Sequence, residues 1–334
     1  MSAFAPSTAA SFRYQMCSFV NFCEEKGLPI FPPHPMTVAR YLTVCAAKSM
    51  VYGTIQNKLS AIVKFYRLCE CSLDISHPCL DLLMRACKRD LSSASKPKSP
   101  IEPGHIILIS TFCDQSDLTK RMFFVALITQ FFACLRKSNL LPPSLRAFSP
   151  FHHLTRGDIK FAAGDIILTL PWTKTLQSKN DVMTVSIAAA PGAVLDPVAI
   201  ISQFLQDFPL PKPTFPAFSL FDGHKIIVLT QQVYIDLLKA HLQALGLPPD
   251  SFSSHSVRRG GTTLMAQAGV DPRLIKLHGG WRSNCYLRYI EPSYADRLTP
   301  TRQMVSHINS LFGAPLGSGP VGTTATISTK TVCS

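Results

Sequence analysis

The sequence lacks the features that would place it in a membrane or on a secretory route. No uninterrupted apolar run approaches the roughly 20 residues that a membrane-spanning helix needs, so no membrane partner is expected. The N-terminal MSAFAPSTAASFRYQ has no charged segment followed by a long apolar core, which a secretory signal requires. A run typical of nuclear localisation is also missing. We expect an intracellular protein, in the nucleus if its host is a eukaryote.

Metal and nucleotide motifs are missing as well. The 11 cysteines form no CxxC pair and no His/Cys cluster at zinc spacing. Cys17, Cys45, Cys87 and Cys134 fall within apolar helical patterns and are interpreted as reduced, buried residues. The sequence contains neither a GxxxxGK[ST] loop nor a carboxylate cluster for Mg²⁺. We therefore expect no metal and no cofactor.

Charge is scarce but strongly unbalanced. Charged residues make up 16% of the chain, with 33 Lys and Arg against 20 Asp and Glu, giving a formal charge of +13. Such an excess favours a polyanionic partner, most commonly nucleic acid, although a merely basic surface would give the same number. The length of 334 residues favours two domains, and 46% hydrophobic residues supply their cores.

The N-terminal region, residues 1–92, is predicted to be a helical bundle. Phe12, Met16, Phe19 and Phe22 recur at helical spacing before Gly27, a typical helix stop. Further helices are predicted from about residues 36, 54 and 79. Residues 93–104 are rich in Ser, Lys and Pro and are interpreted as a basic linker between domains.

The second domain, residues 105–313, is predicted to be mixed. The apolar run LTKRMFFVALITQFFACLRKSNLL, residues 118–141, predicts a long buried helix. GDIKFA, DIILTLPW and DVMTVSI are short β-type segments typical of a small antiparallel sheet. An amphipathic helix closed by Gly246 and two helices divided near residues 269–272 follow. The fold class is thus mainly α with a small antiparallel sheet (α+β), and residues 314–334 are predicted to be disordered.

Four basic residues could form a phosphate-binding cage. His255 and Arg258 lie one helical turn apart and can face one site. Arg136 ends the predicted apolar helix, where an unpaired buried charge would be costly. Lys174 lies at the tip of the predicted hairpin. Arginine binds phosphate bidentately and matches the extra negative charge of a pentacovalent transition state. Each residue taken alone is weak evidence, because an HxxR or a loop lysine is common.

The ordered set is more specific than its members. Arg136 after an apolar helix, Lys174 on a hairpin, the HSVR segment of residues 255–258, then GGW and a tyrosine resembles the tyrosine recombinase (phage integrase) family over residues 100–292. The sequence segments HSVRRGGTT, LIKLHGGW and YLRYI are most similar to those of recombinases of eukaryotic Crypton and DIRS mobile elements. The N-terminal bundle resembles that family's core-binding domain more loosely.

The resemblance implies a role for each basic residue. Arg136 and Arg258 would hold the non-bridging oxygens of the scissile phosphate. His255 would hydrogen-bond the same phosphate and assist proton transfer from the nucleophile. Lys174 would donate a proton to the leaving 5′ oxygen, with Lys179 as the alternative, because the hairpin register is open. The family commonly has an acidic residue soon after its first arginine, where this chain has an asparagine.

The resemblance also separates the tyrosines. Trp281 would occupy the family's further phosphate-binding position through its indole N–H, with a packing role as the alternative and His278 as a poorer occupant. The family's nucleophile follows that position by eight or nine residues. Tyr289 follows Trp281 by eight and Tyr286 by five, so Tyr289 is the predicted nucleophile. Tyr294, beyond Pro292, is a poor candidate.

The resemblance implies a site-specific recombinase that works through a 3′-phosphotyrosyl intermediate on duplex DNA, as a homotetramer, in mobile-element integration or excision. Two alternatives stay open at this point. One is a topoisomerase of type IB that relaxes DNA by the same step without exchanging partners. The other is a domesticated DNA-binding protein without catalysis.

The charge of +13 generates a first prediction. Because phosphate contacts release counterions, affinity for duplex DNA should fall by orders of magnitude between about 50 and about 200 mM salt. Fluorescence anisotropy with a labelled duplex measures this fall. An affinity that does not change with salt, or no binding of any duplex, would contradict it.

Overall fold

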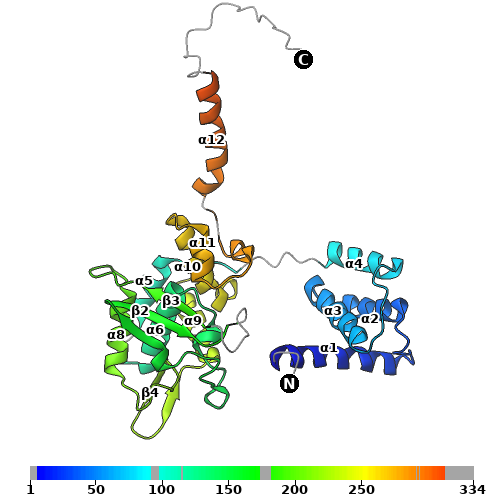
Figure 1. Cartoon of the computed structure of the whole chain (residues 1–334), viewed down its shortest axis with the longest axis horizontal. Coiled ribbons are helices and arrows are strands. Elements are labelled where there is room, and N and C mark those ends of the chain that lie inside the picture. Colours follow the sequence, from blue (N-terminus) through cyan, green and yellow to red (C-terminus); the bar gives the residue numbers. More distant parts are fainter. Residues whose placement is uncertain are drawn as a thin grey trace, which may run out of the picture. The chain divides into compact units, whose positions relative to one another are not determined.

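The computed structural model describes residues 6–91, 98–113, 116–173, 182–290, 292 and 294–312. Two compact units make up the chain, residues 1–97 and 98–334, and each is considered by itself (Figure 1). Of the predicted linker, residues 93–97 lie outside the described residues, as does the predicted tail of residues 314–334. No helix in the described ranges is long and apolar enough to cross a membrane.

The first unit contains four helices, whose starts and ends lie close to the predicted ones. They are α1 (Pro6–Glu25), α2 (Pro35–Ala47), α3 (Tyr52–Leu68) and α4 (Pro78–Asp90). The periodic aromatic and aliphatic residues of α1, α2 and α3 point into one core, and α4 closes it through Leu80 and Cys87. Gly27, with a φ of +60°, follows α1 and lets the chain reverse.

Polar groups inside this core are hydrogen-bonded. Lys58, only 4% exposed, donates to the Tyr41 hydroxyl at 2.9 Å. The Tyr66 hydroxyl donates to the carbonyl of Ile30 at 2.8 Å. Cys45 and Cys87 are buried as predicted, whereas Cys17 is exposed, so the prediction for Cys17 is wrong. Its position in an apolar run did not place it on the core face of α1.

The second unit begins earlier than predicted. The Ser99 amide donates to the Ser251 carbonyl, and the Ile101 amide donates to the Ser256 carbonyl. Ile101 is fully buried in the core. The second half of the predicted linker therefore belongs to the second unit and packs beside the segment that precedes His255.

Helices dominate this unit. They are α5 (Pro103–Phe112), α6 (Leu118–Phe132), α7 (Lys137–Leu140), η1 (Leu145–Ala147), η2 (Arg156–Asp158), α8 (Pro197–Asp207), α9 (Gln231–Ala244), η3 (Pro249–Ser251), α10 (Ser254–Gln267), α11 (Pro272–His278), η4 (Asn284–Arg288) and α12 (Tyr294–Phe312). As predicted, α9 is closed by Gly246 and α10 is divided from α11 at Gly269; both glycines have a φ above +70°.

A small antiparallel sheet covers one side of the unit. Its strands are β1 (Ile159–Ala162), β2 (Asp165–Leu170) and β3 (Met183–Ile187), in that order. Ile166 and Leu168 of β2 are buried, and Leu168 pairs with Val185 of β3. A separate hairpin joins β4 (Ser219–Phe221) to β5 (Ile226–Val228). The mainly helical fold with a small antiparallel sheet agrees with the predicted class.

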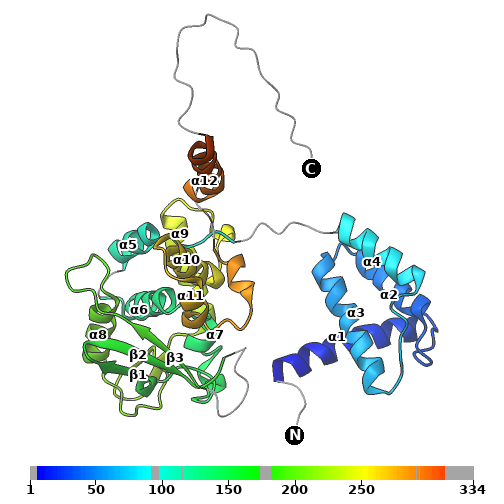
Figure 2. The ribbon, with the colours of Figure 1, turned by 45° about the horizontal axis from the view of Figure 1, so that its top comes forward.

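The apolar helix is shorter than predicted, and its end forms part of the candidate site. The central helix α6 lies among α5, α8, α9 and α10 (Figures 1 and 2). Asp117 caps its N-terminus, and the carboxylate accepts from two backbone amides of the first turn. The helix ends at Phe132, four residues before Arg136. Cys134 takes a φ of +48°, so the chain turns there, and Arg136 becomes the N-cap of α7.

Candidate active site

A buried arginine lies at the centre of the site. Arg258 of α10 is 1% exposed. Its Nη1 donates to the Cys134 carbonyl at 2.5 Å, and its Nη2 donates to the Gly279 carbonyl at 2.7 Å. The guanidinium carbon lies 4.0 Å from the centre of the Trp281 ring and 5.6 Å from that of Tyr289. The arginine thus joins the turn after α6 to the turn after α11, and it faces both aromatic rings.

A second arginine lies near the first. The pKa of Arg258 is lowered to about 10, first by burial and then by the positive charge of Arg136, so it stays protonated at neutral pH. The other groups that act on it are Tyr289, Cys134 and Cys285, and none is a carboxylate. Two neighbouring guanidinium groups without a carboxylate between them favour an anion as the missing partner.

His255 lies in the first turn of α10. Ser253 caps this helix and forms a reciprocal capping box with Ser256. The His255 side chain is exposed, and its ring centre lies 6.5 Å from that of Tyr289. The helix N-terminus adds partial positive charge on the same side. His255 and Arg258 therefore both lie near the Tyr289 ring.

The structure separates the two tyrosines. Tyr286 in η4 is 6% exposed and lies in a small core with Trp281, Cys134 and Ile275. Tyr289, the residue that caps the C-terminus of η4, is half-buried and faces Arg258 and His255. The Thr263 hydroxyl of α10 donates to the Tyr289 carbonyl at 2.9 Å, which ties this residue to the helix that carries the cations.

Comparisons with known proteins find a relative by sequence and solved structures of similar fold. No family model matches the chain. The chain is 22% identical over 293 residues to an integrase/recombinase XerD homolog of Selenomonas ruminantium. The aligned region covers 86% of this chain and 82% of the relative.

Solved structures decide the fold. The Tn1549 transposon integrase in complex with transposon right end DNA matches with a TM-score of 0.62 and 16% identity, over 91% of this chain and 95% of that one. The XerH recombinase bound to difH substrate matches with a TM-score of 0.58 and 13% identity, over 89% and 79%. The chain has the fold of the tyrosine recombinases. A lambda integrase dimer bound to a COC′ core site also matches, with a TM-score of 0.55 and 13% identity, over 88% and 90%.

The resemblance implies a catalytic lysine, Lys174 or its alternative Lys179. Both lie outside the described residues. The chain leading to them is anchored beside the site. The side-chain amide of Asn139, in α7, donates to the Trp172 carbonyl at 2.9 Å. Asn139 stands near the place where relatives commonly carry an acidic residue, and here it ties the exit of β2 to the helix that Arg136 caps.

Trp281 and His278 have different surroundings within the recombinase fold. The Nε2 of His278 lies 2.7 Å from the Phe132 carbonyl, to which it donates. Trp281 is 4% exposed, and its buried Nε1 has no hydrogen-bond partner among the described residues. Trp281 therefore packs against Arg258 and also retains an indole N–H without a partner among the described residues. The phosphate-binding role and the packing role predicted from the sequence both stay open.

The glycine pair Gly260–Gly261 has a packing role that was not predicted from the sequence. A Cβ on Gly260 would lie 1.8 Å from the Ile101 carbonyl oxygen, and one on Gly261 would lie 2.2 Å from that of Phe131. Only glycine permits α10 to approach the backbone of Ile101 and the α6 backbone at Phe131 this closely. The HSVRRGGTT motif contains the signal, since two glycines inside a helix cost stability unless close packing requires them.

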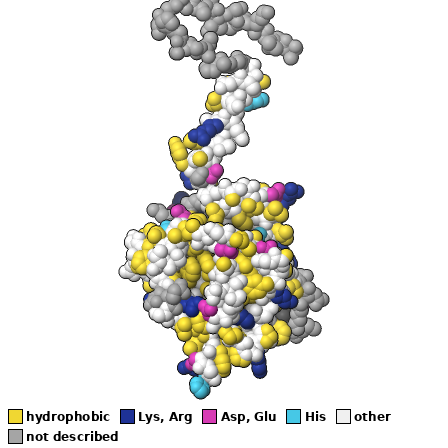
Figure 3. All heavy atoms as spheres, turned by 90° about the vertical axis from the view of Figure 1, so that its left-hand side faces the viewer, with side chains coloured by type: hydrophobic (Ala, Val, Ile, Leu, Met, Phe, Trp, Pro, Cys, Tyr) yellow, Lys and Arg dark blue, Asp and Glu magenta, His cyan; other side chains and the backbone are white. Residues whose placement is uncertain are grey.

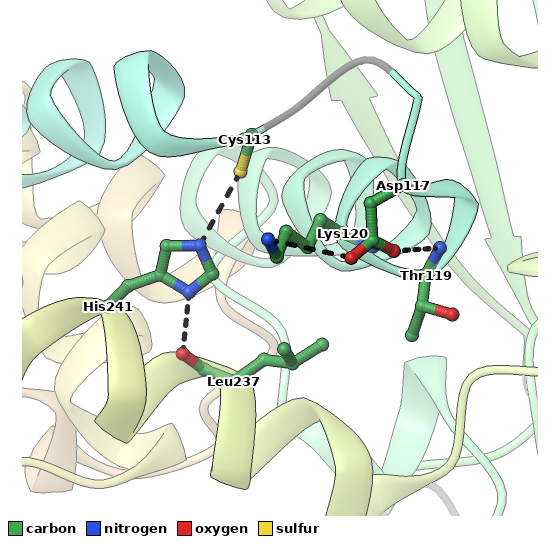
Figure 4. Close-up of polar contacts among 6 residues, drawn as sticks. All are labelled: Cys113, Asp117, Thr119, Lys120, Leu237 and His241. Carbon is green, nitrogen blue, oxygen red and sulfur yellow. Dashed lines mark hydrogen bonds and ion pairs between the residues drawn. The ribbon is translucent and has the colours of Figure 1, made fainter.

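A Cys–His pair elsewhere in the unit is not a second active site. Figure 4 shows Cys113 pointing toward His241 of α9, with its Sγ 3.9 Å from Nε2. His241 donates from Nδ1 to the Leu237 carbonyl and stacks on Phe123. Burial raises the pKa of Cys113 to about 11, so it is a neutral thiol at physiological pH and a poor nucleophile. Within the described ranges, no three His, Cys, Asp or Glu side chains are arranged to hold a metal ion.

The α6–α10 contact generates a second prediction. Gly261→Ala should destabilise the second unit by about 1–3 kcal/mol, because the added methyl group meets the Phe131 backbone, which cannot move aside cheaply. Thermal denaturation measures the loss. Gly104→Ala in α5 is the matched control, since its Cβ meets no atom within 4 Å. Equal melting temperatures for Gly261→Ala and the wild type would contradict the prediction.

Proposed function

We propose that this chain is a site-specific DNA recombinase that cleaves and rejoins strands through a bond between Tyr289 and a 3′ phosphate. One observation carries the proposal: the Tyr289 ring faces the buried guanidinium of Arg258, which has the charge of Arg136 nearby and no carboxylate acting on it, and the exposed His255 lies beside the same ring. A tyrosine that faces such a cation suits an attack on a phosphodiester. The recombinase fold and the DNA complexes of its structural neighbours support the same substrate.

The step balances without an added reactant. The Tyr289 oxygen bonds to phosphorus, the bond from phosphorus to the 5′ oxygen breaks, and the phenolic proton leaves with the help of His255. Lys174 protonates the departing 5′ oxygen. A neutral phenol is a weak nucleophile, with a pKa near 10. Arg136 and Arg258 stabilise the charge that develops on the non-bridging oxygens, and Trp281 adds an N–H donor.

The reverse step rejoins the strand. A 5′ hydroxyl attacks the phosphotyrosyl bond, and Tyr289 leaves with its proton returned. One phosphodiester is exchanged for another, so resealing needs no ATP. In strand exchange the attacking hydroxyl comes from the second duplex. We place this activity in the integration or excision of a mobile element of the eukaryotic Crypton or DIRS kind, acting in the nucleus.

Strand exchange between two duplexes requires four protomers, and α12 supports their association. Its apolar side chains Met304, Val305, Ile308 and Leu311 are each at least half exposed and form one stripe along the helix. An exposed apolar stripe of this kind is typical of a helix that packs on another protein surface. We assign that surface to a second copy of the chain.

On the face drawn in Figure 3, apolar side chains are abundant, and Lys and Arg side chains are scattered. Among the described residues on this face, Lys and Arg therefore form no concentrated basic patch of the kind that duplex DNA would favour.

Tyr289→Phe tests the chemistry. This change removes one hydroxyl and almost no volume, so folding and duplex binding should persist while covalent adduct on a suicide substrate disappears. Tyr286→Phe is the matched control, since Tyr286 belongs to the small core, and it should still form adduct. Peptide mapping of the adduct identifies the linked residue. A phosphotyrosyl link at Tyr286 would show that the nucleophile is assigned wrongly.

The same assay separates the alternatives. Arg258→Ala should lower the cleavage rate by several orders of magnitude, as the loss of a charge-stabilising group in the transition state does. Relaxation of a supercoiled plasmid without exchange between two duplexes would indicate a topoisomerase. Duplex binding without adduct in the wild type would indicate a DNA-binding protein without catalysis.

The α12 stripe generates a prediction of its own. Met304→Asp with Ile308→Asp should reduce strand exchange and the DNA-bound tetramer, while cleavage of a single site continues. Ser306→Asp with Ser310→Asp adds the same charge to the opposite face of α12 and is the control. Analytical ultracentrifugation with core-site DNA measures the assembly. Equal tetramer formation by both double variants would refute the role of the stripe.

A further inference from the structure

A buried glutamine of α6 connects the two segments that carry Arg136 and His255. Gln130 is 0% exposed. Its side-chain Nε2 donates to the Leu135 carbonyl at 2.9 Å and to the Ser254 carbonyl at 3.1 Å. These two acceptors are 119 residues apart in the chain. One amide nitrogen therefore bridges them directly.

The two acceptors hold particular positions. The Leu135 carbonyl belongs to the peptide bond that leads into Arg136, and the Ser254 carbonyl belongs to the peptide bond that leads into His255. Movement of either peptide plane redirects the side chain that follows it. The main-chain carbonyl of Gln130 also accepts from the Leu135 amide at 3.1 Å, so the turn after α6 is held from two sides.

A buried tyrosine holds the glutamine in turn. The Tyr234 hydroxyl of α9 donates to the Gln130 Oε1 at 2.6 Å, and Tyr234 is 0% exposed. Burial raises the pKa of Tyr234, so its hydroxyl stays protonated and remains a donor. Because Oε1 is occupied by this donor, the amide nitrogen must face the two carbonyls. Both amide hydrogens are then used, and each polar atom of the Gln130 side chain has a partner inside the core.

We propose that Gln130, oriented by Tyr234, is a positioning residue that sets the separation of Arg136 and His255 around the scissile phosphate. The proposal rests on the function assigned to those two residues above. Gln130 is too deeply buried to touch DNA and acts through the two peptide groups. Its side chain has the reach and the paired donors for this, whereas an aliphatic residue of the same apolar helix would leave both carbonyls unbonded.

Cleavage kinetics test the proposal. Gln130→Met keeps the length of the side chain and removes both donors. Adduct formation in single turnover should slow by about 100-fold, the loss expected of a displacement near 1 Å, with duplex affinity unchanged. Tyr234→Phe leaves Gln130 in place but frees its orientation, and should slow the reaction less, by about threefold to tenfold. This milder variant keeps the test valid if Gln130→Met does not fold.

A matched control comes from the neighbouring residue. Thr129 is also 0% exposed, and its hydroxyl donates only within α6, to the Val125 carbonyl. Thr129→Val should react at a rate within about threefold of the wild type. In a His255→Ala background, the loss caused by Tyr234→Phe should shrink, because one of the two groups that it positions is gone. Additive losses would show a general structural role and overturn the proposal.

Hydrogen exchange gives a reading that needs no catalysis. In the free protein, Tyr234→Phe should raise amide exchange in residues 133–137 and 254–257 together, and Thr129→Val should not. If the wild type forms no adduct with any duplex, the proposed function fails while this measurement still judges the coupling. If the wild type cleaves DNA but Tyr234→Phe and Gln130→Met match it in rate and exchange, the positioning role falls and the recombinase function stands.

Discussion

The burial of Arg258 is the constraint on which the site depends. A guanidinium without partners inside a protein costs much free energy, and here two backbone carbonyls and an aromatic ring offset that cost. The carbonyls of Cys134 and Gly279 are available only because helices α6 and α11 both end at the site. The position of the cation thus determines where two helices stop, and the two turns in return hold the cation beneath Tyr289.

The charge arrangement is incomplete in the free protein. Burial lowers the pKa of Arg258, and the positive charge of Arg136 lowers it further. A phosphate between the two arginines would raise this pKa, since it supplies a negative charge that both cations can bind. The fold thus tolerates an unfavourable pair of cations in the place where an anionic substrate would stabilise it. The indole N–H of Trp281 likewise has no hydrogen-bond partner among the described residues, and an anionic oxygen would supply one.

Close packing between α6 and α10 gives the site its dimensions. Gly261 lets the two helix backbones approach, and Gln130 joins the ends of the two elements once they are close. A larger side chain at Gly261 would separate the helices, and the distance between the two carbonyls that Gln130 bridges would grow. Packing and polar bonding therefore act on the same separation, which is the spacing of the candidate catalytic groups.

The sequence by itself determined what depends on local spacing. Helical periodicity predicted the four helices described in the first unit, and the short β-type segments predicted β1, β2 and β3 but not the β4–β5 hairpin. The HxxR spacing placed His255 and Arg258 on one face. Tertiary structure decided the rest. The end of α6 at Phe132 is invisible in an apolar run, because the turn at Cys134 depends on a hydrogen bond from Arg258 of α10, which is distant in the sequence. Tyr286 and Tyr289 are equivalent by composition, and only the core around Trp281 buries one and leaves the other facing the cations. Burial and orientation arise from contacts between segments more than 100 residues apart, and a local pattern contains no information about them.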